Sequence, residues 1–543
     1  MADPAPLDRR HKLVIIASSL GTMFEWYDFF IYGTLAAFFG KLFFPPGNES
    51  AAYLSSLALF GVGFSVRPFG ALVFGRLGDL VGRKYTFLLT IILMGLSTTL
   101  VGLLPTYAKV GFVAPLALVL LRLTQGLALG GQYGGAVIYV AEHAPKEKRG
   151  YYTGWIQTTS TCGLFLALVV IGLLRHYLSA AQFADWGWRV PFLVSLILLG
   201  ISVYIRLKLE ESPIYAEMKA QGKSSKAPLT DSFANWDNAK IVLIALFGAT
   251  AGQGVVWYAG QFYSLYFLTT TLGVDYVTAY KLVATALVFG AVLAVGIGAL
   301  SDVLGRKKII VAGFLLAALT YQPIFHGLTR AANPALADAM ERSPVVLTTA
   351  EYKGPVALAL DAMVDAAKKI VRPTTAKTET DKARNYLNAH GIPFTLAPLQ
   401  SADAQVTLRV GAGAAVGGFD EKAYAAALAP AGYPTKADPD AINSPMIVGL
   451  LVLLLGYSAM AYGPIAAFLV ELFPTRIRYT SMSLPYHIGN GWFGGFLPLI
   501  ATSIVVFTGD IYAGLWYPIC ISAMSLVVGI IFLPETKGRD IRG

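Results

Sequence analysis

Charged residues are scarce in this sequence. Lys, Arg, Asp and Glu make up 14% of its 543 residues, 55% are hydrophobic, and the mean hydropathy is +0.59. Soluble domains carry about one quarter charged residues. The composition therefore excludes an ordinary soluble protein and indicates a chain that crosses a membrane many times.

Cysteine is nearly absent as well. Cys162 and Cys520 both lie within apolar runs, so we predict neither a disulfide framework nor a metal site. The net charge of +10 does not indicate nucleic acid, because the basic residues form short clusters between apolar runs instead of one patch. The first apolar run is too long for a cleavable signal, so we expect it to remain as a membrane span.

Long apolar runs are what the sequence has in abundance. Twelve of them are long enough to span a bilayer, at 13–42, 53–75, 86–104, 112–140, 153–174, 189–206, 241–268, 278–300, 309–327, 445–469, 482–507 and 511–533. We therefore predict an all-α membrane protein with two six-helix bundles, the first at 1–207 and the second at 241–327 and 444–543. A polar loop at 208–240 joins them, and residues 328–443 form an insertion.

Lys and Arg in the short loops are concentrated on one side of these spans. Because cytoplasmic loops of membrane proteins are enriched in positive residues, both termini and the 208–240 loop are predicted to be cytoplasmic. The insertion then lies on the outer side of the membrane.

Two loop motifs occur twice. GRLGDLVGRK at 75–84 is repeated by GALSDVLGRK at 298–307, with Asp79 and Asp302 separated by 223 residues. AEHAPKEKRG at 141–150 is repeated by VELFPTRIRY at 470–479, with Glu142 and Glu471 separated by 329. The difference of 106 matches the 116-residue polar segment at 328–443, so that segment is an insertion into a duplicated framework.

The repeated charges suggest a latch on the cytoplasmic face. Asp79 and Asp302 can sit near the N-terminus of the following helix, or pair with Arg83 and Arg306 respectively. Such clusters hold one face closed and break when it opens. The alternative is simple positive-inside anchoring, which two copies of the whole pattern make less attractive. The predicted gating residues are Arg67, Asp79, Arg83, Asp302, Arg306, Glu142 and Glu471.

A few ionisable residues lie inside the spans, where charge is costly and usually functional. Glu25 and Asp28 fall within 60° of each other on the first predicted helix. Two close carboxylates repel, so one of them could carry a proton near neutral pH. Arg122 in the fourth span could pair with an acid or bind an anionic substrate. The alternative is a structural charge network that only holds the spans together.

Several stretches resemble the metabolite:H+ symporter branch of the major facilitator superfamily. They are FEWYDFFIYG (24–33), VRPFGALVFGRLGD (66–79), RLTQGLALGGQYGGA (122–136), EESP (210–213) and GNGWFGGFLP (489–498). The resemblance implies two bundles around a central cavity that opens alternately to each side. It also implies a bacterial inner-membrane carrier of organic acids or betaine- and proline-like osmolytes. The chain departs from the family at Gln132, usually Glu, at His487, usually a neutral polar residue, and in its insertion.

Proton coupling is predicted at Asp28, Glu25 and His487, although His487 could equally be an ordinary bundle histidine. Span 7 adds an aromatic and glutamine stripe that favours a substrate wall. The predicted substrate-binding residues are Arg122, Gln132, Gln157, Gln253, Trp257, Tyr258, Gln261, Tyr486 and Asn490.

The insertion contains alternating strand-like and helix-like runs, which predict a small α/β module serving as a cover or partner surface. It shows no nucleophile–base set, so we do not expect an enzyme. The leading hypothesis is a proton-coupled symporter importing a small organic acid such as a dicarboxylate, oxo acid or shikimate-like carboxylate. It would act as a monomer in the lipid bilayer, without a cofactor, driven by the proton gradient. The alternatives are a betaine/proline-type symporter and a membrane-anchored sensor that uses the module.

Overall fold

The computed structural model describes residues 9–46, 49–81, 83–131, 134, 137–138, 140–141, 144–207, 236–350, 378–399, 405–474 and 478–541. Within these ranges, the side chains of 9–18, 49–51, 75–76, 78–81, 83–84, 87, 206 and 479 are not described.

The first half of the chain forms a bundle of long helices. Its α-helices are α1 (Arg9–Thr34), α2 (Ala36–Phe43), α3 (Glu49–Ser65), α4 (Arg67–Val81), α5 (Arg83–Leu103), α6 (Tyr107–Val110), α7 (Val113–Gly130), α9 (Arg149–Tyr177), α10 (Ala180–Asp185) and α11 (Val190–Leu207). Together α3 and α4 form the second predicted span, which breaks at Val66 before Pro68.

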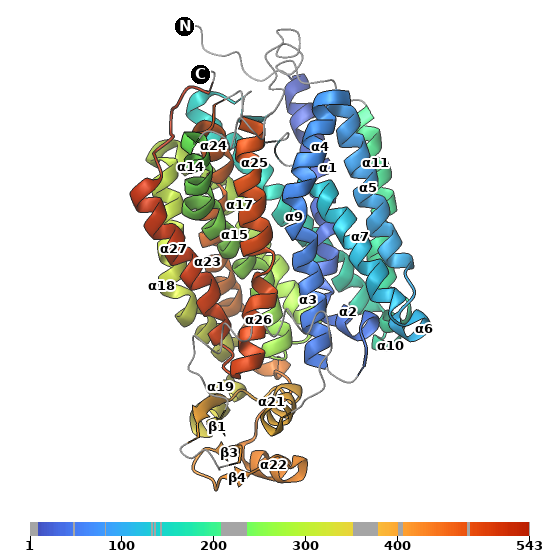
Figure 1. Cartoon of the computed structure of the whole chain (residues 1–543), viewed down its shortest axis with the longest axis vertical. Helices are drawn as coiled ribbons and strands as arrows, with labels where there is room; N and C mark the ends of the chain where they lie inside the picture. Colours follow the sequence, from blue (N-terminus) through green and yellow to red (C-terminus); the bar gives the residue numbers. More distant parts are fainter. Residues whose placement is uncertain are drawn as a thin grey trace.

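The second half forms a matching bundle beside the first (Figure 1). Its α-helices are α14 (Trp236–Ala245), α15 (Ala251–Tyr258), α16 (Ser264–Tyr266), α17 (Tyr276–Leu304), α18 (Arg306–Ala332), α23 (Ser444–Tyr462), α24 (Ile465–Leu472), α25 (Arg478–Ile488), α26 (Leu497–Thr508) and α27 (Trp516–Phe532). Span 7 runs continuously from α14 through α15 and α16 to Thr271, and it includes three wide π-helical turns, η3 (Leu246–Thr250), η4 (Ala259–Tyr263) and η5 (Phe267–Thr271). A fourth, η8 (Gly489–Gly494), lies in span 11. Such turns are frequent at functional sites.

Ten helical segments of the described residues are long and apolar enough to cross a membrane. Helices α1 and α5, of 26 and 21 residues, correspond to the remaining two predicted runs, so all twelve have a helical counterpart. The ninth span is longer than expected, because α18 continues to Ala332 instead of ending near 327.

The insertion forms a small α/β module at one end of the bundles (Figure 1). It comprises α19 (Pro334–Arg342), β1 (Val345–Thr349), α21 (Glu379–Ala389), β2 (Thr395–Pro398), β3 (Thr407–Val410), β4 (Val416–Gly417) and α22 (Glu421–Leu428). The strand order is β2-β1-β3-β4, with β1 parallel to β2 and antiparallel to β3. Its own apolar core includes Leu347, Leu387, Phe394 and Leu408. One of the helix-like runs that the sequence predicts in the insertion, at 361–371, lies outside the described residues.

We call the end of the bundles that carries the α/β module the module end. The opposite end carries the start of α1 and the last described residues of the chain, and we call it the terminal end. Contacts between the two halves occur at both ends and in the middle, where the site lies.

Candidate functional site

Two arginines are buried at the middle of the first half. Arg67 begins α4 and is 1% exposed, and Arg122 on α7 is fully buried. Glycine allows these helices to approach closely: a Cβ on Gly126 would lie 1.8 Å from the Gly63 carbonyl oxygen, and one on Gly130 would lie 2.1 Å from that of Arg67. The sequence thus brings both guanidinium groups into one dry interior.

Aromatic rings of α1 and α3 surround these guanidinium groups. The Phe29 ring contacts both, with its centroid 4.8 Å from Arg67 Cζ and 4.2 Å from Arg122 Cζ. Arg67 also lies over Phe64 at 3.8 Å, and Arg122 over Tyr32 at 4.4 Å. Cation–π contact of this kind offsets part of the cost of burial. The FEWYDFF stretch therefore holds the arginines with its aromatic residues, a role that sequence reasoning missed.

Neither arginine is neutralised by a carboxylate among the described residues. Arg122 Nη1 donates to Gln125 Oε1 at 2.7 Å, and Gln125 Nε2 donates to Thr98 at 2.8 Å. The Nε and Nη2 atoms of both Arg67 and Arg122 have no hydrogen-bond partner in the described structure. Buried charge without a counter-ion is costly, so this pair is suited to receiving an anion.

Two of the three predicted proton carriers, Asp28 and Glu25, are buried on α1. Asp28 is 5% exposed and lies beside Ser195 of α11, with Glu25 close enough for the two charges to interact. Its Oδ1 has no hydrogen-bond partner among the described residues. Of the two roles that the sequence left open for Arg122, pairing with an acid or binding an anion, the first is not seen among the described residues. A buried carboxyl without a cation avoids the cost of its charge by taking up a proton.

The second half faces the arginines with polar and aromatic side chains. Gln253 and Asn490 hydrogen-bond each other through both amide groups, at 3.0 and 2.8 Å. The hydroxyl groups of Tyr462 and Tyr486 lie 3.0 Å apart, and both rings lie within electrostatic reach of Arg67. Gln157 of α9 donates to the Tyr462 carbonyl at 3.1 Å, which joins the two halves.

Aromatic stacking closes the gap between the halves. Trp257 stacks on Phe30 of α1 with 5.4 Å between centroids, and Tyr258 meets Phe64 of α3 edge-on at 5.2 Å. His487 is buried and lies near Arg67. Gln261 is buried next to this aromatic group, and its Oε1 has no partner in the described part of the chain. Tyr258 and Tyr486 therefore lie within electrostatic reach of Arg67, and hydrogen bonds and a ring contact join Gln157, Gln253, Trp257 and Asn490 to the same group of tyrosines.

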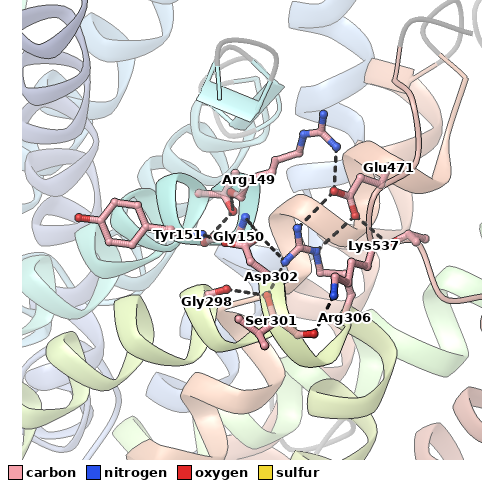
Figure 2. A network of polar contacts seen from close by, with 12 residues as sticks. Arg149, Gly150, Tyr151, Gly298, Ser301, Asp302, Arg306, Glu471 and Lys537 are labelled. Atoms are coloured by element: carbon pink, nitrogen blue, oxygen red, sulfur yellow. Dashed lines mark hydrogen bonds and ion pairs between the residues drawn. The ribbon is translucent and has the colours of Figure 1, made fainter. Parts of the chain in front are cut away.

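A second cluster of charge lies at the terminal end (Figure 2). Glu471 of α24 accepts from Arg149 of α9 at 2.8 Å and from Arg306 of α18 at 3.3 Å. Arg306 also pairs with Asp302 at 2.7 Å. Thr536, past α27, donates to Glu471 at 3.0 Å. These five residues, which we call the terminal network, link the first half to the second. Four of them are buried, and Asp302 is partly buried.

Asp302 joins the halves in a way that the sequence did not predict. Its carboxylate accepts from the backbone N–H groups of Gly150 and Tyr151, both at 2.8 Å, at the start of α9 in the other half (Figure 2). The expected cap of its own following helix, α18, is supplied by Glu535, which accepts from Arg306 N at 2.8 Å. A carboxylate at a helix N-terminus is favoured by the unpaired N–H groups and by the dipole.

The terminal network contains Asp302, Arg306 and Glu471 from the predicted latch, together with Arg149 and Thr536, and Glu535 contacts Arg306 beside it. Arg149 stands in the repeated AEHAPKEKRG motif, so its position offered a signal, whereas the two C-terminal residues offered none. Arg67, predicted with the latch, lies instead among the rings described above. The side chains of Asp79 and Arg83, and residues Gln132 and Glu142, lie outside the described residues.

At the module end the halves meet through hydroxyl groups and rings. Tyr266 donates to the carbonyl oxygen of Gly33, and Tyr280 donates to that of Thr34 at 3.3 Å. Arg175 of α9 lies over the Tyr276 ring of α17 at 4.3 Å. This end is closed without a buried ion pair among the residues described.

Comparisons with known proteins agree with this architecture. Residues 13–241 and 421–543 match the family model for the sugar (and other) transporter family. An inner membrane metabolite transport protein of Escherichia coli, YhjE, is 38% identical over 337 residues, covering 61% of this chain and 76% of its own. The alpha-ketoglutarate permease of the same organism is 32% identical over 326 residues, covering 60% and 74%. A proline/betaine transporter of E. coli is 41% identical over 210 residues, covering 39% and 42%.

Among solved structures, the xylose transporter XylE from E. coli, in a partially occluded inward open conformation, superposes with a TM-score of 0.60. It is 15% identical, and the alignment covers 97% of this chain and 99% of that one. At this identity the match supports the fold alone.

Two six-helix halves joined by breakable contacts at both ends define a membrane transporter of the major facilitator type. The chain belongs to the sugar (and other) transporter family within that superfamily. The predicted fold class and the resemblance to metabolite:H+ symporters are thereby confirmed, as is the prediction that the protein is a transporter and not an enzyme. It is a multi-pass protein of the inner membrane. The direction in which its termini point stays a prediction.

Proposed function

We propose that the protein is a proton-coupled symporter that imports a small organic acid by alternating access. The substrate carboxylate binds Arg122 and Arg67, and the proton binds Asp28, assisted by Glu25. The observation that carries this proposal is the pair of buried guanidinium groups, each with two nitrogens that have no partner in the described structure.

The charge balance of the site favours an anion over a neutral solute. Arg67 and Arg122 lie within electrostatic reach of each other, and no carboxylate among the described residues pairs with either. Guanidinium groups bind carboxylates with two parallel hydrogen bonds, and each arginine has an Nε and an Nη2 available for such a contact. A small acid with one or two carboxylates would supply the missing negative charge.

Asp28 supplies the proton site, because it is buried and forms no ion pair with either arginine in the described structure. A proton on Asp28 and an anion on the arginines would each remove an uncompensated charge from the interior. Loading both would make the closed intermediate, through which the halves must pass, less costly than loading one. The proton gradient would be the energy source, and no cofactor is required.

The test uses purified protein and proteoliposomes. A thermal-shift screen should show stabilisation by 2-oxoglutarate, succinate or shikimate, since a ligand that binds the folded state raises its melting temperature. Uptake of the stabilising acid should acidify the vesicle lumen and stop when a protonophore is added. Uptake that ignores the proton gradient would rule out symport, and the absence of stabilisation by any organic acid would rule out the substrate class.

A betaine- or proline-type osmolyte is the second candidate. The rings of Trp257, Tyr258 and Phe262 form an aromatic wall that suits a quaternary ammonium group. The two nearby arginines disfavour a further positive charge there, so we place this candidate below an organic acid. Competition between glycine betaine and a labelled organic acid in the same vesicles separates the two. A sensor that works through the module would lose its response when the module is deleted, whereas a transporter would keep measurable flux.

A further inference from the structure

The module leaves the second half and returns to it at one point. The backbone N–H of Asn443, just before α23, donates to the carbonyl of Ala331, at the end of α18, at 2.8 Å. Asn333 donates to the Leu272 carbonyl at 2.9 Å, and Ala437 N to the Gly273 carbonyl at 3.1 Å. The module is therefore fixed at its base to the second half, and it can be removed without stretching the bundle.

Helix α21 of the module reaches beyond this base. It packs against α26 of the second half and also against α3 of the first half, and α3 and α26 pack against each other. Figure 1 shows α21 at the module end, beneath the lower ends of these two helices. The helix thus covers a line along which the two halves must part when this end opens.

Specific contacts fix α21 to residues 506–509 of the second half, and we call these contacts the seat of α21. Asn388 donates to the Val506 carbonyl at 2.8 Å, and the buried Arg384 lies over the Phe507 ring at 4.4 Å. Just after α21, Phe394 N donates to the Gly509 carbonyl at 3.0 Å. Gly509 has a φ of +78°, and a Cβ on it would lie 2.4 Å from the Phe394 ring. The turn after α26 and the module are therefore fitted to each other.

We infer that the module is a brace that holds the module end closed. It is anchored to the second half at its base and at 506–509, while its contact with α3 ties the first half to it. Opening at this end must break the α21–α3 contact, so the brace raises the cost of that opening. This contact is made in addition to those of Tyr266 and Tyr280 within the bundles.

The inference is tested by the accessibility of a buried cysteine at each end. Cys162 and Cys520 are replaced by Ser in the full-length protein. Thr34→Cys then reports on the module end, because Thr34 is 5% exposed and its carbonyl accepts from Tyr280. Ala294→Cys, 6% exposed and next to Gly154 of α9, reports on the bundle interface nearer the terminal end. The rate of labelling by a membrane-impermeant maleimide is measured in detergent, without substrate.

Two variants loosen the seat of α21, and one serves as a control. Asn388→Ala removes a hydrogen bond, and Gly509→Ala pushes a methyl group into the Phe394 ring. Gly391→Ala is the matched control, because Gly391 also has positive φ, at +65°, but has nothing within 4 Å of its Cβ position. Its backbone strain resembles that of Gly509→Ala without the collision.

We expect Asn388→Ala and Gly509→Ala to raise Thr34→Cys labelling by about fivefold, the effect on a population of one lost hydrogen bond. Ala294→Cys labelling should not change, and Gly391→Ala should match the parent. If Gly509→Ala fails to fold, Asn388→Ala decides the outcome. A further variant that joins Ala332 to Asn443 with a short Gly-Ser linker should label at least as fast as the point variants.

Labelling at the parent rate in these variants, or an equal rise at both reporter sites, would overturn the inference. Neither result depends on the substrate, so the test stands apart from the proposed function.

Discussion

The two ends of the helix bundles are closed by different chemistry. At the terminal end, Glu471 neutralises Arg149 and Arg306, and Asp302 caps a helix of the opposite half. At the module end, Tyr266 and Tyr280 donate single neutral hydrogen bonds to backbone carbonyls. Both sets of contacts connect the same two halves.

The two ends should therefore differ in how much stability they lose when one interacting side chain is removed. Removing one member of a buried ion pair leaves the other charged and desolvated, at a cost of about 3–5 kcal/mol. Removing one neutral hydrogen bond costs about 0.5–1.5 kcal/mol. The terminal network should therefore act as an all-or-none latch, while the module end should loosen gradually and so gains most from an added brace.

Glu471→Gln should have the largest effect. The amide cannot neutralise Arg149 and Arg306, so the terminal end loses its closed state and uptake should fall by about 100-fold or more, as expected for several kcal/mol. Initial rates in proteoliposomes measure this, with surface expression as the control. Ala294→Cys labelling should rise in the same variant. Near-normal uptake would show that side-chain packing holds the terminal end closed and that the ion pairs contribute little.

Arg122→Gln should abolish uptake of the organic acid without lowering the melting temperature of the empty protein. Arg122 has no carboxylate partner among the residues described, so burying its charge destabilises the folded protein. Removing that charge should therefore not destabilise it. Differential scanning fluorimetry and uptake are measured together.

Arg189→Gln provides the contrast for this test. Arg189 donates to the carbonyls of Gly102 and Leu104, at 3.1 and 2.9 Å, where α5 ends. This variant should melt at a lower temperature and keep its uptake, because it loses structural hydrogen bonds worth about 1 kcal/mol each. A large fall in melting temperature for Arg122→Gln would instead make Arg122 a structural residue.

Sequence alone was sufficient for the twelve spans and for the position of the insertion, because apolar length and repeated loop motifs are local signals. It also identified Asp28 and Arg122 as costly charges and Glu471 as part of a latch. It did not reveal their partners. Helical angles placed Asp28 on the first span, but they said nothing about which neighbouring helix that face meets. The structure turns Asp28 toward Ser195 and leaves Phe29 to contact the arginines.

The terminal network shows the same limit. Asp302 was expected to cap the following helix or to pair with Arg306. It does pair with Arg306, but it caps α9 of the other half, and Glu535 takes its place on α18. Such exchanges depend on how two distant segments pack. The sequence indicates that a latch exists, while only the packing of the halves determines which residues complete it.

Asp28→Asn should separate uptake from the proton gradient. The amide is neutral at every pH, so the buried site no longer needs a proton to lose its charge. We expect concentrative uptake to disappear while exchange of labelled for unlabelled acid continues, because exchange needs no net proton movement. Glu25→Asn, one turn away, should have a weaker effect. Retained concentrative uptake in Asp28→Asn would move the proton site to Glu25 or His487.

Tyr280→Phe should give the smallest effect. It removes the hydrogen bond to the Thr34 carbonyl and keeps the ring, so the closed module end should lose about 0.5–1.5 kcal/mol. Labelling of Thr34→Cys should then rise by roughly two- to twelvefold, since 1.4 kcal/mol corresponds to a factor of ten. Tyr276→Phe is the control, because Arg175 contacts the ring of Tyr276 and the ring is kept.

When Tyr280→Phe is combined with Asn388→Ala, the two increases should multiply, because the hydrogen bond and the module seat lie on different elements and oppose the same opening. An increase no larger than that of either single variant would mean that the brace acts through Tyr280 and is not a separate closure.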